Sequence, residues 1–190
     1  MWWLCRALVV GLFGVVLFVP LAPADTPESP NDNSNLNLLP ARSFAPLLGS
    51  WIVASRDAAI AEGVERIPPD IADALAGYVP SEVLRKVRWR AGGGTALSLQ
   101  QTLFRIGDYP AVTLDYVIVF LDDAKARDDP KLWAHELKHV MQYAEWGVAG
   151  FAERYLEDYE AVEREAAEFR WEWMKQAGLI PPPCAPRGCN

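Results

Sequence analysis

The 190-residue sequence contains only two histidines and no long run of Lys and Arg. Its 18 basic and 25 acidic residues give a formal net charge of −7. Because a nucleic-acid partner normally requires a basic stripe, this pattern argues against DNA or RNA binding. One short basic segment, residues 85–90, is interpreted as a strand beside the core. With 51% hydrophobic residues, the chain can bury the core of one domain but is too short for two.

Long apolar runs are also scarce, because no stretch of 18 consecutive apolar residues occurs after residue 24. Residues 1–24 contain one cation, Arg6, then an apolar stretch and a Leu-Ala-Pro-Ala ending, the order typical of a secretory signal peptide. The apolar stretch is shorter than the roughly 20 residues of a membrane-spanning helix, with an uncleaved anchor as the alternative. We therefore expect a periplasmic or secreted protein that contacts a membrane only if this segment is retained.

Cysteine occurs three times, and Cys5 lies in the predicted signal peptide. In an oxidising compartment, Cys184 and Cys189 could close a small disulfide loop across a Pro- and Gly-containing turn. Two free thiols on a tail are the alternative. A metal-binding pair is disfavoured because four residues lie between the two cysteines rather than two.

The remaining chain divides into three parts by composition. Residues 25–42 are rich in Pro, Asn and Ser and are predicted to form a disordered linker. A single folded domain is predicted at residues 43–178, followed by a C-terminal tail at residues 179–190.

The first half of this domain reads as short helices followed by strands. Helices are predicted at residues 47–61, from Pro68 to Gly77, and from Pro80 into the basic strand. Three glycines, Gly92 to Gly94, then break the chain. Strands are predicted at residues 95–106, 111–114 and 116–121, and a charged loop at residues 122–129.

Two helices complete the predicted domain. Asp129 is a good N-cap, Pro130 suits the first helical position, and Gly147 ends the helix. A second helix is predicted at residues 149–176. Its apolar residues recur every three or four positions, as expected for one core-facing side: Tyr155, Tyr159, Val162, Ala166, Phe169 and Trp173. This order of elements predicts an α+β domain with a small antiparallel sheet packed on helices.

The two histidines lie on the first of these helices, four residues apart, in the sequence His135-Glu136-Leu137-Lys138-His139. This spacing places both imidazoles on one helix face, where they can occupy two corners of a tetrahedral zinc site. Glu136 then lies beside the open corner, where it can accept a proton from a water molecule. This arrangement is the physical basis of the HExxH motif. Two ordinary surface or capping histidines are the alternative.

A wider sequence around the motif resembles a family of bacterial HExxH metallopeptidases. The resemblance covers LWAHELKHVMQY at residues 132–143, WGVAGFA at 146–152, Tyr155, VEREA at 162–166, and AVTLDYVIVF at 111–120. Members of that family are secreted or are associated with contractile injection systems. The resemblance implies a zincin-like, gluzincin-like fold in which a glutamate downstream of the motif is the third zinc ligand. It implies no particular substrate.

The third ligand is expected on the last predicted helix. A hairpin turning near residues 147–150 brings Glu157, Glu160 and Glu163 opposite the two histidines. Glu163 lies about 80° from the centre of the apolar stripe, whereas Glu160 lies about 140° away. Glu163 is therefore preferred, and the Glu-x-x-Ala pattern of the family also selects it. Glu165 is the alternative, at about 80° on the other side.

Together these residues predict a zinc-dependent hydrolase, specifically a metallopeptidase. His135, His139 and Glu163 would hold Zn²⁺, with Glu136 as general base. A peptide or protein substrate would lie along an edge strand, and Tyr155 or Tyr159 could assist the reaction as an electrophile. The alternatives are an exported, zinc-stabilised binding or scaffold module without turnover, and an exported structural protein with incidental histidines.

Two positions depart from the patterns of related zinc peptidases. Lys138 is charged, whereas uncharged residues are favoured between the motif's Glu and second His; we expect Lys138 to point to solvent. Thermolysin-like enzymes place an acid four residues after the ligand Glu, to orient a histidine, and here that position is Ala167. The residue that orients the histidine must come from elsewhere or be absent.

Overall fold

The computed structural model describes residues 40–107 and 109–180. The predicted signal peptide, most of the predicted linker and the Cys184–Cys189 pair lie outside these residues. The last two linker residues, 41 and 42, belong to a short 3-10 helix, η1 (Ala41–Phe44). Within the two described ranges, no helix combines the length and the hydropathy needed to cross a membrane.

A four-stranded sheet lies at the centre of the domain. Its strands are β1 (Glu65–Arg66), β2 (Arg88–Ala91), β3 (Ala111–Leu114) and β4 (Val117–Phe120), in the order β1-β2-β4-β3. The α+β class is confirmed, but the prediction of an antiparallel sheet is wrong, because β2 runs parallel to β4. The chain between β2 and β4 contains a helix and β3, which is long enough for the crossover that parallel neighbours require. β3 is an edge strand that pairs only with β4.

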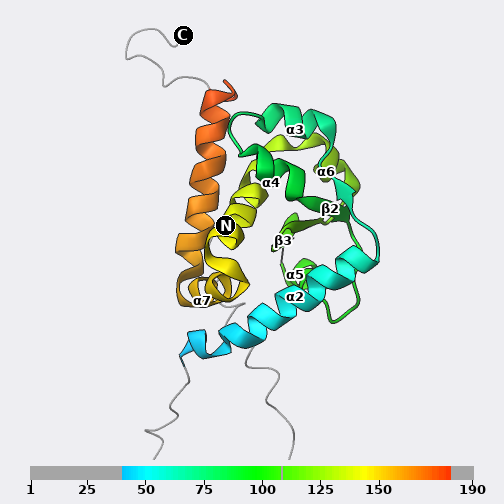
Figure 1. Ribbon diagram of the computed structural model, residues 1–190, viewed down its shortest axis with the longest axis vertical. Coiled ribbons are helices and arrows are strands. Elements are labelled where there is room, and N and C mark those ends of the chain that lie inside the picture. Colours follow the sequence, from blue (N-terminus) through cyan, green and yellow to red (C-terminus); the bar gives the residue numbers. More distant parts are fainter. Residues whose placement is uncertain (1–39, 108, 181–190) are drawn as a thin grey trace, which may run out of the picture.

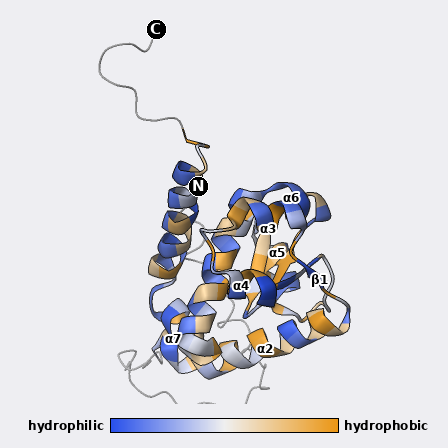
Figure 2. Ribbon diagram, turned by 45° about the horizontal axis from the view of Figure 1, so that its top comes forward, coloured by the Kyte–Doolittle hydropathy of each residue, from blue (hydrophilic) through white to orange (hydrophobic). Residues whose placement is uncertain are grey.

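β4 is buried on both of its faces, which confirms the strand predicted there from apolar composition. Alternate residues enter two hydrophobic clusters. Val117 and Val119 pack in the cluster that includes residues of α2 (Ala45–Ala61), and Ile118 and Phe120 pack in the cluster that includes Trp133. Figure 2 shows strongly hydrophobic strands in the interior, whereas β1 is hydrophilic. The buried sheet therefore packs directly against the helix that carries the two histidines.

Three of the short helices occur where the sequence predicts them. α2 matches the helix predicted at residues 47–61, α3 (Pro69–Leu75) the one between Pro68 and Gly77, and α4 (Ser81–Lys86) the weaker one that precedes the basic strand. Pro68 and Pro80 each immediately precede a helix as its N-cap residue. The helices α3 and α4 lie at the opposite end of the sheet from α2 (Figure 1).

Two other segments differ from the prediction. Residues 99–106 form a helix, α5 (Leu99–Ile106), rather than part of a strand. Leu99 and Leu103 lie four residues apart and share one helix face, whereas the polar run at residues 100–102 interrupts a strand's alternation. The predicted loop at 122–129 contains α6 (Asp123–Asp128), where the Asp122 side chain caps the helix by accepting from the Lys125 backbone N–H.

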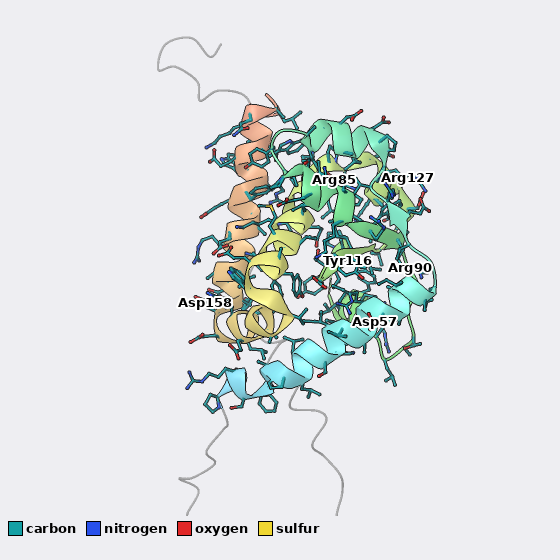
Figure 3. The ribbon with its side chains drawn as sticks, in the orientation of Figure 1. Asp57, Arg85, Arg90, Tyr116, Arg127 and Asp158 are labelled. Carbon is teal, nitrogen blue, oxygen red and sulfur yellow. The ribbon has the colours of Figure 1, made fainter. Side chains whose placement is uncertain are left out.

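The last element, α7 (Pro130–Gln176), contains two backbone breaks, at Gly147 (φ 68°, ψ 167°) and at Asp158 (φ −151°, ψ 76°). The break at Gly147 confirms the predicted helix end, because this conformation is open almost only to glycine. The break at Asp158, labelled in Figure 3, was not predicted. We call residues 130–146 the first segment and residues 159–176 the second segment. The chain turns back between them, and the two segments run in opposite directions (Figure 1).

Candidate metal centre

The first segment presents both histidines to the same point. Its start is fixed by Asp129, whose Oδ1 accepts the backbone N–H groups of Lys131 and Leu132, each at 3.1 Å. One helical turn separates His135 from His139, and their Nε2 atoms lie 3.2 Å apart. His139 is buried with a side-chain exposure of 7%, and His135 is half-buried at 17%.

Glu163 reaches these two nitrogens from the second segment. Its Oε2 lies 3.2 Å from His135 Nε2, and its Oε1 lies 3.5 Å from His139 Nε2. The break at Asp158 precedes this segment, and Asp158 Oδ1 accepts the Ala161 backbone N–H at its start. The ligand atoms of the three residues all lie within 4.8 Å of one another.

The spacing of these donor atoms fits a zinc ion. Nitrogen and oxygen ligands lie about 2.0–2.2 Å from Zn²⁺, so two corners of a tetrahedral site are about 3.3–3.6 Å apart. The three contacts above measure 3.2, 3.2 and 3.5 Å. Two imidazoles and one carboxylate are also a donor set that zinc commonly takes in sites with an open position.

Gln142 fixes the orientation of His139. The Gln142 Nε2 donates to Val162 O at 3.2 Å and to Glu165 Oε2 at 3.0 Å, both of which can only accept. The Oε1 of this amide therefore faces His139 Nδ1, at 2.8 Å, and this imidazole nitrogen must be the donor. In the neutral ring, Nε2 then carries the free lone pair and points towards His135 and Glu163, as a metal ligand requires. The Nδ1 of His135 is buried and has no hydrogen-bond partner in the described part of the chain.

The metal-free centre is an ion pair across the two segments. Burial alone would lower the pKa of His139, but the hydrogen bond and the charge of Glu163 raise this pKa to about 9. Burial alone would raise the pKa of Glu163, but hydrogen bonds from His135 and His139 hold it well below its usual range. A metal ion that bound here at neutral pH would therefore have to displace a proton held between His139 and Glu163.

Glu136 lies beside the histidines with one carboxylate oxygen already engaged. Thr113 of β3 donates its hydroxyl to Glu136 Oε2 at 2.7 Å, and the glutamate is only 5% exposed. Within the described residues, this carboxylate makes no other side-chain hydrogen bond. Its second oxygen is free to accept a proton, and the hydroxyl holds the group in one position.

A cavity of about 320 Å³ opens in front of this glutamate. It is lined by His135, Glu136, His139 and Glu163, by apolar residues of α5, and by the edge strand β3. The volume is at the lower end of the range for small-molecule and peptide side-chain pockets.

Of the two tyrosines considered from sequence, only Tyr155 reaches the centre. It lines the cavity, and its hydroxyl donates to Glu163 Oε1 at 3.3 Å, so it positions the carboxylate. Burial raises the pKa of Tyr155 well above its usual value, which keeps the hydroxyl protonated. Tyr159 packs against Tyr155 and does not line the cavity.

The other acids considered from sequence do not face the two histidine nitrogens. Glu157 and Glu160 are exposed. Glu165 instead accepts from Gln142 and pairs with Lys138, whose Nζ lies 3.4 Å from Glu165 Oε2. Lys138 therefore does not simply point to solvent but joins the two segments outside the centre.

Sequence reasoning missed Thr113 and Gln142. Gln142 lies seven residues after His135 and three after His139, so it shares their helix face and could have been found from that spacing. Thr113 had no comparable signal, because its contact with Glu136 depends on how β3 is placed against the first segment.

Residues 67–147 match the eCIS core domain, where eCIS denotes an extracellular contractile injection system. The matched segment runs from the start of the α3 region to the break at Gly147, so it includes both histidines and Glu136 but ends before Glu163. The match covers less than half of the chain and makes residues 67–147 similar to that domain. No curated protein and no solved structure matches the chain.

Proposed function

We propose that the protein is a zinc-dependent hydrolase that cleaves peptide bonds, with a zincin-like arrangement of its centre. The observation that carries the proposal is the triangle of His135, His139 and Glu163 donor atoms with the spacing of zinc ligands. Zn²⁺ held there would act as a Lewis acid, lowering the pKa of a water to about 7 and polarising the scissile carbonyl.

Glu136 is the proposed general base. Thr113 holds its Oε2, and the free oxygen takes the proton of the attacking water and delivers it to the leaving amine. Because the Thr113 hydroxyl already holds the carboxylate and Glu136 lines the cavity, the group needs no large rearrangement to act. Gln142 and Tyr155 act indirectly, by holding His139 and Glu163 in place.

The edge strand supports a peptide as the substrate. β3 pairs with β4 on one side only, and its residues Ala111, Val112 and Thr113 line the cavity beside Glu136. An extended peptide that enters the cavity can pair with an edge strand through main-chain hydrogen bonds, while its side chains contact the apolar lining. The match to the eCIS core domain leads us to propose that the protein is exported and acts with a contractile injection system.

The second candidate is a zinc-stabilised scaffold module without turnover. The observation that favours it is the same match, because its description names a core domain. The two candidates share the metal and differ in the role of Glu136.

Digestion of a broad peptide library by zinc-loaded protein separates these candidates. Glu136→Gln removes the base but keeps the size and the Thr113 contact, so we expect zinc to be retained and cleavage to fall about 10²–10⁴-fold. Glu153→Gln changes an exposed glutamate of α7 and serves as the matched control. Equal cleavage by wild type and Glu136→Gln would contradict the role of this residue. A zinc-loaded wild type that cleaves nothing would favour the scaffold.

A further inference from the structure

Among the described residues that line the cavity, Arg170 is the one arginine or lysine. It belongs to the second segment, the same helix that carries Glu163. The surroundings are mostly apolar, with Leu99 and Leu103 of α5 and Leu132 of the first segment among the lining residues. The mechanism proposed above gives this arginine no role.

The position of Arg170 follows from the helix geometry. Seven residues separate it from Glu163, so both side chains leave nearly the same face, about 10.5 Å apart along the axis. The two segments run in opposite directions, and Leu132 lies as far before His139 as Arg170 lies after Glu163. Leu132 and Arg170 therefore lie at one end of the cavity, with Arg170 two helical turns beyond Glu163 and Leu132 less than one turn before His135.

No acid neutralises Arg170 within the described residues. The positions three and four residues away on its own helix, where an ion-pair partner would sit, are Ala166, Ala167, Trp173 and Met174. The other half-buried arginines have partners: Arg56 contacts Asp115 at 2.8 Å and Arg90 contacts Glu62 at 2.9 Å, whereas Arg88 donates to backbone carbonyls. Arg170 makes no ion pair or hydrogen bond with any part of the chain that the structure describes.

The other charged side chains that line the cavity favour a carboxylate at the Arg170 end. With Zn²⁺ bound at the centre, the carboxylates of Glu136 and Glu163 would balance its two charges, which leaves Arg170 as the uncompensated charge of the cavity. A guanidinium in an apolar, partly desolvated setting binds a carboxylate by two parallel, charge-assisted hydrogen bonds. An extended peptide advances about 3.3–3.6 Å per residue, so the 10.5 Å separation corresponds to about three residues.

We infer that Arg170 makes the cavity selective for peptides that carry a carboxylate about three residues from the scissile bond. This inference rests on the proposed function for the location of the scissile bond. The carboxylate can belong to an Asp or Glu side chain or to the C-terminus of a short peptide, and these two sources share the same recognition chemistry.

The test uses quenched fluorescent octapeptides with a central apolar pair and one Glu placed in turn at each other position. Each has a twin with Gln, and each twin is made with a free and with an amidated C-terminus. Zinc-loaded wild type is expected to prefer the best Glu peptide, or the free C-terminus, about tenfold to hundredfold in kcat/KM. The position of the preferred Glu, or the effect of amidation, identifies the source of the carboxylate.

Arg170→Gln is expected to reduce this preference to less than about threefold, and Arg170→Lys to keep part of it. Arg164→Gln, an exposed arginine of the same helix, is the control and should keep the full preference. A thermal melt of each variant excludes misfolding. If Arg170 instead donates to a peptide carbonyl, Arg170→Gln will slow the Glu and Gln twins equally, which would overturn the inference.

Binding of the same peptides to Glu136→Gln, measured by fluorescence anisotropy, separates this inference from the proposed function. Carboxylate-dependent binding that Arg170→Gln removes, without cleavage by wild type, would uphold the inference and contradict the peptidase. Cleavage without any carboxylate preference would uphold the peptidase and contradict the inference about Arg170. Peptides that neither bind nor react would overturn the inference.

Discussion

The two segments of α7 contribute to the centre in different ways. Nine residues of the first segment are buried, against three in the second, Val162, Ala166 and Trp173. Figure 2 accordingly shows the second segment as largely hydrophilic. The two histidines thus belong to a helix held by the core on several sides, whereas Glu163, with 38% side-chain exposure, comes from a helix held along one face. We therefore expect the first segment to determine the stability of the domain and the second to complete the candidate metal centre.

Replacing one buried tryptophan in each segment is expected to give the largest difference between the two segments. Trp133 packs against Trp89 and Phe120 in the first segment's core, and Trp173 ties the second segment to Ala74 of α3. We expect Trp133→Ala to lower the free energy of unfolding by about 3–5 kcal/mol. Trp173→Ala should cost less stability but weaken zinc binding, because it loosens the helix that carries Glu163. Urea unfolding of metal-free protein and zinc titration measure the two effects.

The control for this pair is Trp171→Ala, since Trp171 is 49% exposed and should change neither quantity. Equal losses of stability for Trp133→Ala and Trp173→Ala would show that the two segments are equally important to the core. The claim that the first segment contributes more to stability than the second would then be wrong.

The ion pair between the segments predicts how the stability of the metal-free protein depends on pH. Glu163 raises the pKa of His139 from 6.5 to about 9, so this pair stabilises the fold fully below about pH 6.5. The contribution is lost as the pH rises through about 9 and amounts to about 3 kcal/mol at most. On the acid side, the lowered pKa of Glu163 means that its contribution is lost as the pH falls below 4.5.

Thermal melts of metal-free protein between pH 5 and pH 9 measure this dependence. His139→Gln removes the titrating group and should flatten the decline above pH 6.5. A wild type whose stability does not fall between pH 6.5 and pH 9 would show that the two segments are not joined by this pair.

A smaller effect is expected where Gln142 connects the segments. Gln142→Leu keeps the approximate size but leaves His139 Nδ1 without its acceptor, so zinc affinity should fall about 10- to 100-fold. Gln176→Leu, an exposed glutamine at the end of the second segment, is the control. A competition titration with a zinc chelator gives both affinities. Unchanged affinity in Gln142→Leu would mean that the helix alone orients the imidazole.

The first segment could be predicted well from the sequence, because its signals are local. Asp129 and Pro130 mark its start, Gly147 marks its end, and the spacing of the two histidines defines a face. The helix face also predicts Glu163, and the structure brings this residue to both histidines. Contacts between elements could not be predicted in this way, such as the hydroxyl of Thr113 on Glu136.

The features of the fold that the sequence did not predict also lack a clear local signal. The break at Asp158 carries no glycine or proline to mark it. The helix α5 has only eight residues, which is too short for its period to override the strand-like residues Leu97 and Leu99 that alternate at its start. The parallel pairing of β2 with β4 depends on the tertiary path of the chain between them.

Zinc binding by the purified protein tests the central claim most directly. Metal analysis after dialysis against zinc-containing buffer is expected to give one zinc per wild-type chain. His135→Ala, His139→Ala and Glu163→Ala should each lose it, and Glu160→Gln and Glu165→Gln should keep it. A wild type without zinc, or a Glu163→Ala variant that binds zinc as tightly as wild type, would contradict the account.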